Sequence, residues 1–294
     1  MKDLSEIKWK VVSGIPSVLR KLPLRWSVRV GAFLGLLLWA VDKKRVDEAE
    51  RRCVRALQVG VTPARQIVRR SYMNLGRSVA EFAALPGSGK SLRPIVHLHG
   101  EEHLRDAMKS GGGVIFFSAH MGNWELGAAL LAELGYPMNA IGANQRDDRV
   151  TDLVISLRAL CGVTTVSKGF DLKAAIRCLK KGEALAILID QDVREKGVFV
   201  PFLGIPASTP YGPAKIAGKL GSVLLPSFMI RRGSSAEHDL HVLPSPWKNG
   251  RPDPEETMEN AMARCNDLIG EWIRAYPEQW MWLYPRWAST PEEL

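Results

Sequence analysis

The sequence predicts an α/β fold, built on a mostly parallel sheet with helices on both faces. From residue 95 onward, short apolar segments alternate with stretches of helical spacing, which is the order that such a sheet requires. Gly, Pro and other turn residues bound the apolar segments, as they bound buried strands. No internal repeat or low-complexity linker divides the 294 residues. The expected strands are 95–98, 114–117, 138–143, 163–166, 185–189 and 223–230.

The region before the sheet is expected to be helical. Residues 47–85 have helical spacing and end at the sequence Pro-Gly-Ser-Gly-Lys-Ser, residues 86–91. This segment resembles a phosphate-binding loop, but that motif requires a glycine where Ala84 stands and a strand before it. The sequence therefore predicts an ordinary loop at 86–91.

The N-terminal segment is expected to associate with a membrane. Residues 30–41 are apolar and uncharged, but twelve residues are fewer than the roughly twenty that span a hydrocarbon core. Aromatic and basic residues suited to lipid headgroups flank them, including Trp9, Trp26 and the cluster 43–45. A buried helix of a soluble protein is the alternative.

No cleavage site of the signal-peptide type follows the apolar run, so we expect an anchor that is retained. The helix either lies in the interface or spans marginally, with Arg25 and Arg29 reaching the headgroups. We expect residues 1–45 to form the membrane-anchoring segment and residues 46–294 the catalytic domain.

The charge predicts an acidic partner. The formal net charge is +9, which suits nucleic acid, an anionic membrane surface or an acidic carrier protein. Nucleic acid is disfavoured because the basic residues are dispersed and no reader motif occurs. The four cysteines, at positions 53, 161, 178 and 265, are scattered along the chain without the spacing of a metal site or of a disulfide framework. His97, His99 and His103 lie close together in sequence, but no carboxylate or thiol cluster accompanies them. No metal site is therefore expected.

A histidine at a strand-to-helix junction is the first candidate for chemistry. His120 follows the strand expected at 114–117, and Glu125 would lie in the first turn of the next helix, for which Asn123 is a good N-cap. A carboxylate bonded to one imidazole nitrogen fixes the tautomer and leaves the other nitrogen as a general base. Backbone N–H groups of the turn from Gly122 onward could stabilise an oxyanion.

A second acidic site follows the expected strand at 185–189. Asp190, Gln191 and Asp192 would face the same crevice as His120 if the two strands are neighbours, since ligands meet the carboxyl ends of parallel strands. A simple turn is the alternative. The sequence does not decide which carboxylate pairs with the histidine.

Downstream residues are candidates for substrate contacts. Residues 197–204 are apolar but broken by Pro and Gly, and could form a wall for an acyl chain or sugar. Ser208 or Thr209 could cap a helix that begins near Pro210 and carries Lys215. A capped helix start binds anions, such as a phosphate on an acceptor.

These blocks together resemble the glycerolipid acyltransferase superfamily. The spacing from His120 to Glu125 is similar to the family's His-x4-Asp/Glu motif, in the Glu form of the late acyltransferases of lipid A biosynthesis. Arg146 and Arg286 match family arginines, although the residues around them differ from the family pattern. The further blocks that carry the resemblance, between about residues 95 and 290, are 172–183, 190–192, 197–204, 207–210 and 277–282.

The resemblance implies transfer of a fatty acyl group from a thioester to a hydroxyl of a membrane lipid, without a cofactor. It favours acyl carrier protein over acyl-coenzyme A as donor, and a lipid A precursor as acceptor. Phosphoinositide mannosides and lysophospholipids remain open as acceptors. It also implies a place on the cytoplasmic face of the bacterial inner membrane. The expected catalytic residues are His120, Glu125, Asp190 and Asp192, and the expected substrate-binding residues are Asn123, Arg146, Gln191, Ser208, Thr209, Lys215 and Arg286.

Two other classes of function fit less well. A serine hydrolase would need an exposed nucleophile, but no Gly-x-Ser-x-Gly occurs and Ser118 is expected inside a strand. A noncatalytic membrane-binding protein would not need His120 near carboxylates at strand ends.

Overall fold

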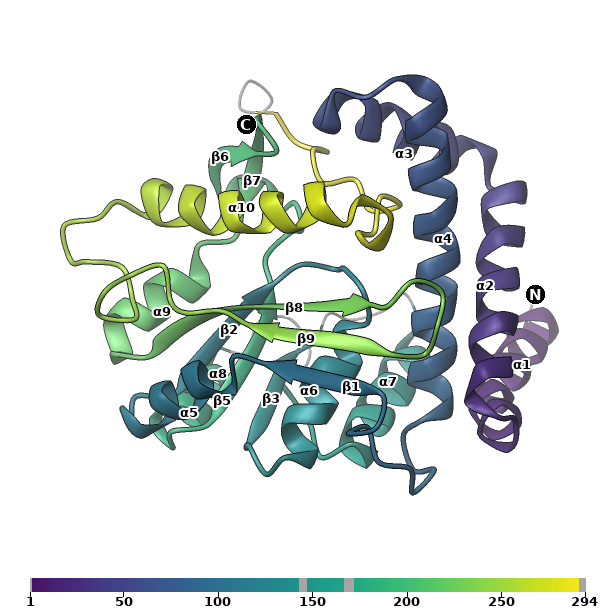
Figure 1. The fold of residues 1–294 in the computed structure, drawn as a ribbon, viewed down its shortest axis with the longest axis horizontal. Helices are drawn as coiled ribbons and strands as arrows, with labels where there is room; N and C mark the ends of the chain where they lie inside the picture. Colours follow the sequence, from purple (N-terminus) through teal and green to yellow (C-terminus); the bar gives the residue numbers. More distant parts are fainter. Residues whose placement is uncertain (1, 143–146, 167–171, 291–294) are drawn as a thin grey trace.

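A seven-stranded sheet forms the centre of the molecule (Figure 1). The computed structural model describes residues 2–142, 147–166 and 172–290. The strand order is β1-β9-β8-β2-β5-β3-β4, and every neighbouring pair is parallel except β8 and β9. The strands of this sheet are β1 (Val96–His99), β2 (Val114–Ser118), β3 (Met138–Ile141), β4 (Thr164–Val166), β5 (Ala184–Leu188), β8 (Val223–Arg231) and β9 (His238–Val242).

The predicted fold class is confirmed, and each of the six expected strands is present with its ends within two residues of the expected ones. Two features were not predicted from the sequence: strand β9, and a separate antiparallel hairpin of β6 (Val198–Phe202) with β7 (Ile205–Thr209). The expected wall at 197–204 is therefore mainly β6 and its turn. Its side chains Phe202 and Leu203 are buried.

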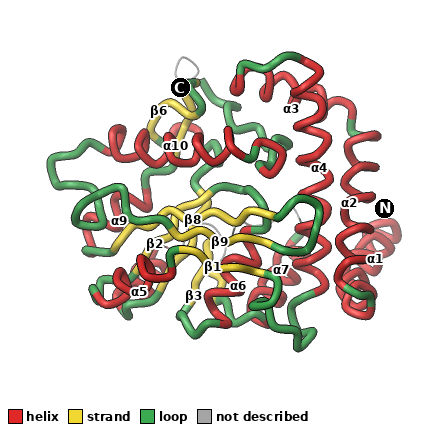
Figure 2. The backbone as a smooth tube through the Cα atoms, viewed as in Figure 1, coloured by secondary structure: helices red, strands yellow, loops and turns green. Residues whose placement is uncertain are grey.

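Helices cover both faces of the sheet (Figure 2). Alternate residues of a strand point to opposite faces, so Ile115 and Phe117 of β2 enter one core while Val114 and Phe116 enter the other. Burying each of these side chains contributes about 1.5–3 kcal/mol. The helices of this part are α5 (Glu101–Lys109), α6 (Trp124–Glu133), α7 (Asp148–Leu160), α8 (Leu172–Lys180), α9 (Gly212–Leu220) and α10 (Met258–Ala275), with short 3₁₀ turns at Arg194–Lys196 (η1) and Pro277–Gln279 (η2).

Four helices precede the sheet, and the last two cover most of the residues 47–85 for which helical spacing was predicted. The four are α1 (Lys2–Lys21), α2 (Leu24–Val41), α3 (Lys43–Leu57) and α4 (Val61–Ala84). Figure 1 shows α4 between α2 and the sheet domain. Residues 86–91 are turn and bend, as expected for a loop.

Glycines fasten α2 to α4. A Cβ added at Gly31 would collide with the carbonyl oxygen of Gly76, and a Cβ at Gly76 with that of Gly31. A Cβ at Gly35 would likewise meet the carbonyl of Tyr72. The two backbones are in direct contact, so little relative movement of the two helices is possible without separating them.

Within the described residues, α2 is the one helix long and apolar enough to cross a membrane. Its 18 residues have a mean hydropathy of 1.4 and 28% of them are buried. At 1.5 Å per residue it is about 27 Å long, close to the thickness of a hydrocarbon core. The helix is longer than the predicted run because it includes residues 24–29. Its exposed large apolar side chains are Trp26, Val30, Phe33, Leu34, Leu37, Leu38 and Val41.

Candidate active site

His120 and Asp190 meet at the carboxyl ends of two neighbouring strands. His120 lies after β2 and Asp190 after β5, and these strands pair in parallel. The imidazole Nδ1 lies 2.7 Å from Asp190 Oδ1, and the backbone N–H of His120 donates to Asp190 Oδ2 at 2.8 Å. Sheet topology thus joins residues that are 70 positions apart.

The carboxylate of Asp190 is buried but well solvated by protein donors. Its side chain is 3% exposed, and Oδ2 also accepts a hydrogen bond from the Trp280 indole at 2.8 Å. Burial raises the pKa of Asp190, but the facing imidazole and these hydrogen bonds outweigh burial and hold the pKa below its usual value. An ionised Asp190 favours the tautomer with the proton on Nδ1, which leaves Nε2 as an acceptor.

The imidazole itself remains accessible. The His120 side chain is 15% exposed and lies against Trp124 edge to face, with ring centroids 4.9 Å apart. The backbone carbonyl of His120 accepts a hydrogen bond from Met281 N–H. The ring is therefore held on both sides while one edge stays open.

Glu125 lies in the first turn of α6, as predicted, but it binds an arginine. Its carboxylate accepts two hydrogen bonds from Arg158, from Nε at 2.8 Å and from Nη2 at 2.7 Å, and one from the Trp124 indole at 3.2 Å. None of the hydrogen bonds found among the described residues joins Glu125 to His120. Arg158 was not predicted as a site residue. The only local sign of its role is that it is the one charged residue in the apolar second half of α7.

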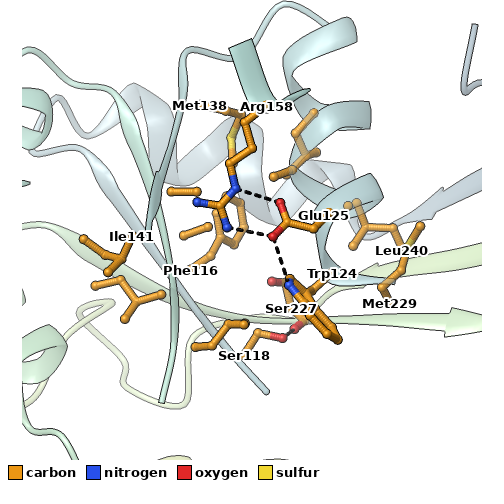
Figure 3. A pocket seen from close by; sticks show the side chains of 17 residues that line it. Phe116, Ser118, Trp124, Glu125, Met138, Ile141, Arg158, Ser227, Met229 and Leu240 are labelled. Carbon is orange, nitrogen blue, oxygen red and sulfur yellow. Dashed lines mark hydrogen bonds and ion pairs between the residues drawn. The ribbon is translucent and has the colours of Figure 1, made fainter. Parts of the chain in front are cut away.

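A mainly apolar pocket lies beside the histidine (Figure 3). Its volume is about 60 Å³. Ser118 and Trp124 line it together with apolar side chains such as Phe116, Met138 and Met229, and Figure 3 shows the pair of Glu125 and Arg158 projecting into it. Nη1 of Arg158 has no hydrogen-bond partner within the described structure.

Asn123 serves the turn after His120. Its Oδ1 accepts from the N–H of Leu126 and caps α6, as predicted, while its Nδ2 donates to Glu81 Oε2 at 2.8 Å. The side chain is 1% exposed, so both ends of the amide are occupied by protein groups. Gly122 precedes it at φ +59°, and a Cβ there would collide with the carbonyl of Met229.

A buried ionic network holds this turn in place. Arg231 forms a bidentate pair with Glu81, with both side chains fully buried. Ser78 Oγ contacts Arg231 and donates to the Gly122 carbonyl at 2.8 Å, and Gln279 accepts the Gly122 N–H at 2.9 Å. Because Gly122 N–H is already used, the expected oxyanion donors reduce to amides at the start of α6.

Asp192 and Gln191 lie next to Asp190 but have different surroundings. The carboxylate of Asp192 accepts from the backbone and hydroxyl of Ser289, both at 2.9 Å, and from the N–H of Arg194. It thereby holds the C-terminal segment against the loop after β5. Gln191 is half-buried.

The expectation that Ser208 or Thr209 caps a helix is wrong. Both residues lie in β7, and α9 begins at Gly212 after Tyr211, which makes no side-chain cap. The two residues instead accept hydrogen bonds from Arg286, at Ser208 O and Thr209 Oγ1. The strand continues to Thr209 because it pairs with β6, so neither residue lies at the start of α9, where a capping side chain would have to be.

Arg286 is fully buried. Its guanidinium lies 4.6 Å from the centre of the Phe202 ring, and burial lowers its pKa to about 10 against the opposing effect of Asp190 and Asp192. Lys215, in contrast, is exposed on α9 with Nζ 5.5 Å from the Tyr211 ring.

Two further expectations concern other parts of the chain. Arg146 falls outside the described residues. His99 bonds Asp239 at 2.7 Å, and no group of three His, Cys, Asp or Glu side chains suited to a metal ion occurs in the described ranges.

Comparison with known proteins identifies relatives along nearly the whole chain. The family model described as bacterial lipid A biosynthesis acyltransferase matches residues 4–289. The chain is 26% identical over 284 residues to the lipid A biosynthesis lauroyltransferase of Escherichia coli K12, covering 95% of this chain and 90% of that protein. It is 24% identical over 267 residues to the lipid A biosynthesis palmitoleoyltransferase of the same strain, covering 88% and 85%. It is also 25% identical over 198 residues to a phosphatidylinositol mannoside acyltransferase of Mycobacterium tuberculosis CDC 1551, covering 66% and 60%.

Proposed function

The chain belongs to the bacterial lipid A biosynthesis acyltransferase family, and we propose that it moves a fatty acyl group from acyl carrier protein to a hydroxyl of a lipid A precursor, with His120 as general base. The observation that carries the mechanism is the 2.7 Å contact between His120 Nδ1 and the buried Asp190. It leaves Nε2 on the accessible edge of the ring. An alcohol is a weak nucleophile at neutral pH until such a base removes its proton.

The reaction then follows from these positions. Nε2 takes the proton of the acceptor hydroxyl as its oxygen attacks the thioester carbonyl carbon. Amides at the start of α6, where the helix dipole is positive, stabilise the oxyanion. When the C–S bond breaks, the sulfur leaves with the electron pair and the imidazolium returns the proton to it. Asp190 stays ionised throughout and stabilises the imidazolium.

The pocket in Figure 3 is the proposed entrance for the acyl chain. Its position beside Trp124, whose ring meets His120 edge to face, and its apolar walls support this role. Its volume of about 60 Å³ corresponds to roughly two water-sized groups, so a fatty chain requires side chains to move. Met138 and Met229 are suited to such a movement because methionine has several rotatable bonds.

The remaining expected site residues divide by their surroundings. Asp192, Asn123, Ser208, Thr209 and Arg286 are occupied by contacts within the protein, so we propose that they support the site rather than touch substrate. Gln191 and the exposed Lys215 are proposed contacts for the polar part of a substrate.

We propose that residues 1–45 anchor the enzyme to the cytoplasmic face of the bacterial inner membrane. The exposed apolar side chains of α2 and the formal charge of +9 support this location. Trp26 and Trp9 each lie against an arginine, Arg29 at 5.0 Å and Arg149 at 5.2 Å from the ring centres. Such aromatic and cationic groups are suited to the membrane interface.

The test is an assay of the full chain in detergent with isotopically labelled acyl carrier protein, acyl-coenzyme A and extracted membrane lipids. Product masses identify donor and acceptor. We expect His120→Ala to lower turnover by about 10²–10⁴-fold, the usual contribution of a general base. His103→Ala, on remote α5, is the matched control and should keep full activity. Turnover of His120→Ala within a few-fold of the parent would remove the base assignment.

A phosphoinositide mannoside is the second candidate acceptor. The similarity to the mycobacterial phosphatidylinositol mannoside acyltransferase favours including it. The same product masses distinguish the two acceptors, since an acylated mannoside and an acylated lipid A precursor differ in headgroup mass.

A further inference from the structure

A basic groove lies on α4, outside the pocket beside His120. Its volume is about 640 Å³, and it lies between α4, the turn joining β8 to β9, and η2. Arg69, Arg70 and Arg77 of α4 line it together with polar groups from the other two elements, including Gln279. Glu278 is the one acidic residue in this lining.

The arginines of the groove lack anionic partners. In the described structure, no ion pair or hydrogen bond involves the side chains of Arg69, Arg70 or Arg77, and the one carboxylate buried nearby, Glu81, is already bound to Arg231 and Asn123. Burial, and then the charge of Arg231, lower the pKa of Arg77. The groove therefore carries positive charge that the protein itself does not neutralise.

The cation of the neighbouring hairpin is neutralised, in contrast. Arg232, next to the β8–β9 turn, pairs with Asp239 at 2.6 Å and with Glu237 at 3.6 Å. Among the described residues, Arg69, Arg70 and Arg77 on α4 form no ion pair of this kind. Arg69 and Arg77 are eight positions apart on this helix, about 12 Å at 1.5 Å per residue, which is longer than a single phosphate group needs.

The groove and the α2 contact lie on adjoining sides of α4 that meet at Arg69. Gly76 contacts Gly31 of α2, and Arg77, the next residue, is turned by about 100° around the helix axis. The groove is lined by α4, the β8–β9 turn and η2, although one of its arginines, Arg69, also lies 5.9 Å from the ring of Trp39 on α2. Among the described residues, Arg70 and Arg77 make no such contact with α2, so their charge is available to a soluble partner in the groove.

The floor of the groove is continuous with the catalytic turn. Gln279 lines the groove and accepts the Gly122 N–H, two residues after His120. Asn74, also in the lining, accepts a hydrogen bond from Arg231, which belongs to the network under the same turn. A partner seated in the groove would contact residues that are hydrogen-bonded to the turn after His120 or to the network beneath it.

We propose that this groove docks an acidic carrier protein that delivers the acyl thioester. The proposal rests on the proposed function and specifies where its donor binds. Carboxylates on the carrier surface would pair with Arg69 and Arg70, and such complementary charges mainly speed association and fix orientation. The attraction weakens with salt, because the Debye length falls from about 10 Å at 0.1 M to about 3 Å at 1 M.

The experiment measures KM for acyl carrier protein and for a small acyl-pantetheine thioester, using the full chain in detergent. The variant is Arg70→Glu, which reverses an exposed, unpaired charge. Arg70→Lys keeps the charge, and Arg105→Glu reverses an exposed arginine on remote α5. We expect Arg70→Glu to raise KM for the carrier about tenfold at low salt, with kcat and the small-thioester kinetics unchanged and both controls near the parent. The difference should shrink as salt rises.

Three results would overturn the proposal. One is an unchanged carrier KM in Arg70→Glu and in Arg69→Glu. Another is a rise in KM or a fall in kcat that is equal for both donors, which would make the groove a structural surface. Loss of binding of Arg70→Glu to vesicles of anionic phospholipid would likewise overturn the proposal, because the groove would then face lipid. Failure of the proposed function is distinct, since the parent protein itself would then transfer no acyl group from either donor.

Discussion

Replacing Asp190 with asparagine tests the hydrogen-bond arrangement behind His120. The substitution keeps the volume of the side chain but turns one of two acceptor oxygens into a donor. Asp190 Oδ2 accepts from His120 N–H and from the Trp280 indole, while Oδ1 faces His120 Nδ1. The asparagine can therefore take one of two orientations.

The energies of the two orientations decide the outcome. Directing the amide NH₂ toward the two N–H groups would leave both buried donors unpaired, at about 1–3 kcal/mol each. Directing it toward the imidazole leaves no donor unpaired but requires Nδ1 to accept, so the ring proton moves to Nε2. His120 could then no longer accept a proton there. A wrong tautomer of this kind costs about 10⁴-fold in a serine protease, and we expect a loss of that order.

The stability should change much less than the rate. In the favoured orientation two hydrogen bonds to a charged oxygen become bonds to a neutral one, a loss of roughly 1 kcal/mol each. We expect free energy of unfolding to fall by about 2 kcal/mol, measured by urea denaturation. Single-turnover acyl transfer measures the rate, and ¹⁵N chemical shifts of His120 report the tautomer. Activity within tenfold of the parent, or a ring still protonated at Nδ1, would refute the reasoning.

Four other predictions follow from the structure. Glu125→Gln should lower transfer by less than Asp190→Asn without changing the His120 tautomer, because Glu125 binds Arg158 rather than the imidazole; equal tautomer shifts in both variants would contradict this. Gly76→Leu should lower the melting temperature by several degrees, since even a Cβ there collides with the α2 backbone, whereas the same change at Gly14, which has open space, should not. Burial lowers the pKa of His238 to about 4, so between pH 6.5 and 4 this histidine is protonated in the unfolded chain but not in the folded one. The free energy of unfolding should therefore fall by up to about 3 kcal/mol as pH falls from about 6.5 to 4. In His238→Asn, the free energy of unfolding measured by denaturation should lack this dependence on pH. Phe33→Glu, on the exposed face of α2, should weaken binding to anionic liposomes while activity on detergent-dispersed acceptor is retained, and unchanged liposome binding would argue against the anchor.

Local signals predicted much of the fold. The strand β2 and the start of α6 were predicted because apolar runs, glycines and the Asn123 cap act within a few residues. Strand β9 was missed because its sequence, His-Asp-Leu-His-Val, has only two apolar residues and begins with two polar ones, so it shows no apolar run. Its identity as a strand depends on pairing with β1 and β8, which are distant in sequence.

The site was predictable only where contacts are local. Glu125 is close to His120 in sequence, but the carboxylate that contacts the ring is Asp190, brought there by the pairing of β2 and β5. The buried ion pair of Arg231 and Glu81 could not be predicted, because the two residues are 150 positions apart and charged residues are usually exposed. No local sequence pattern indicates such a pair. Arg286 was expected at a headgroup, whereas it is used inside the protein.

The packing of α4 fixes the position of the reactive ring relative to α2. One side of this helix touches the α2 backbone at Gly76, and another holds the turn after His120 through Ser78 and Glu81. With α2 in the membrane, as proposed, the ring is mounted on a rigid strut rather than on a flexible tether. Its height above the lipid surface is then constant. Acceptor hydroxyls at one depth of the lipid headgroup region can reach the ring, and those deeper or shallower cannot. The depth of a hydroxyl would then determine which one is acylated, independently of the shape of the headgroup.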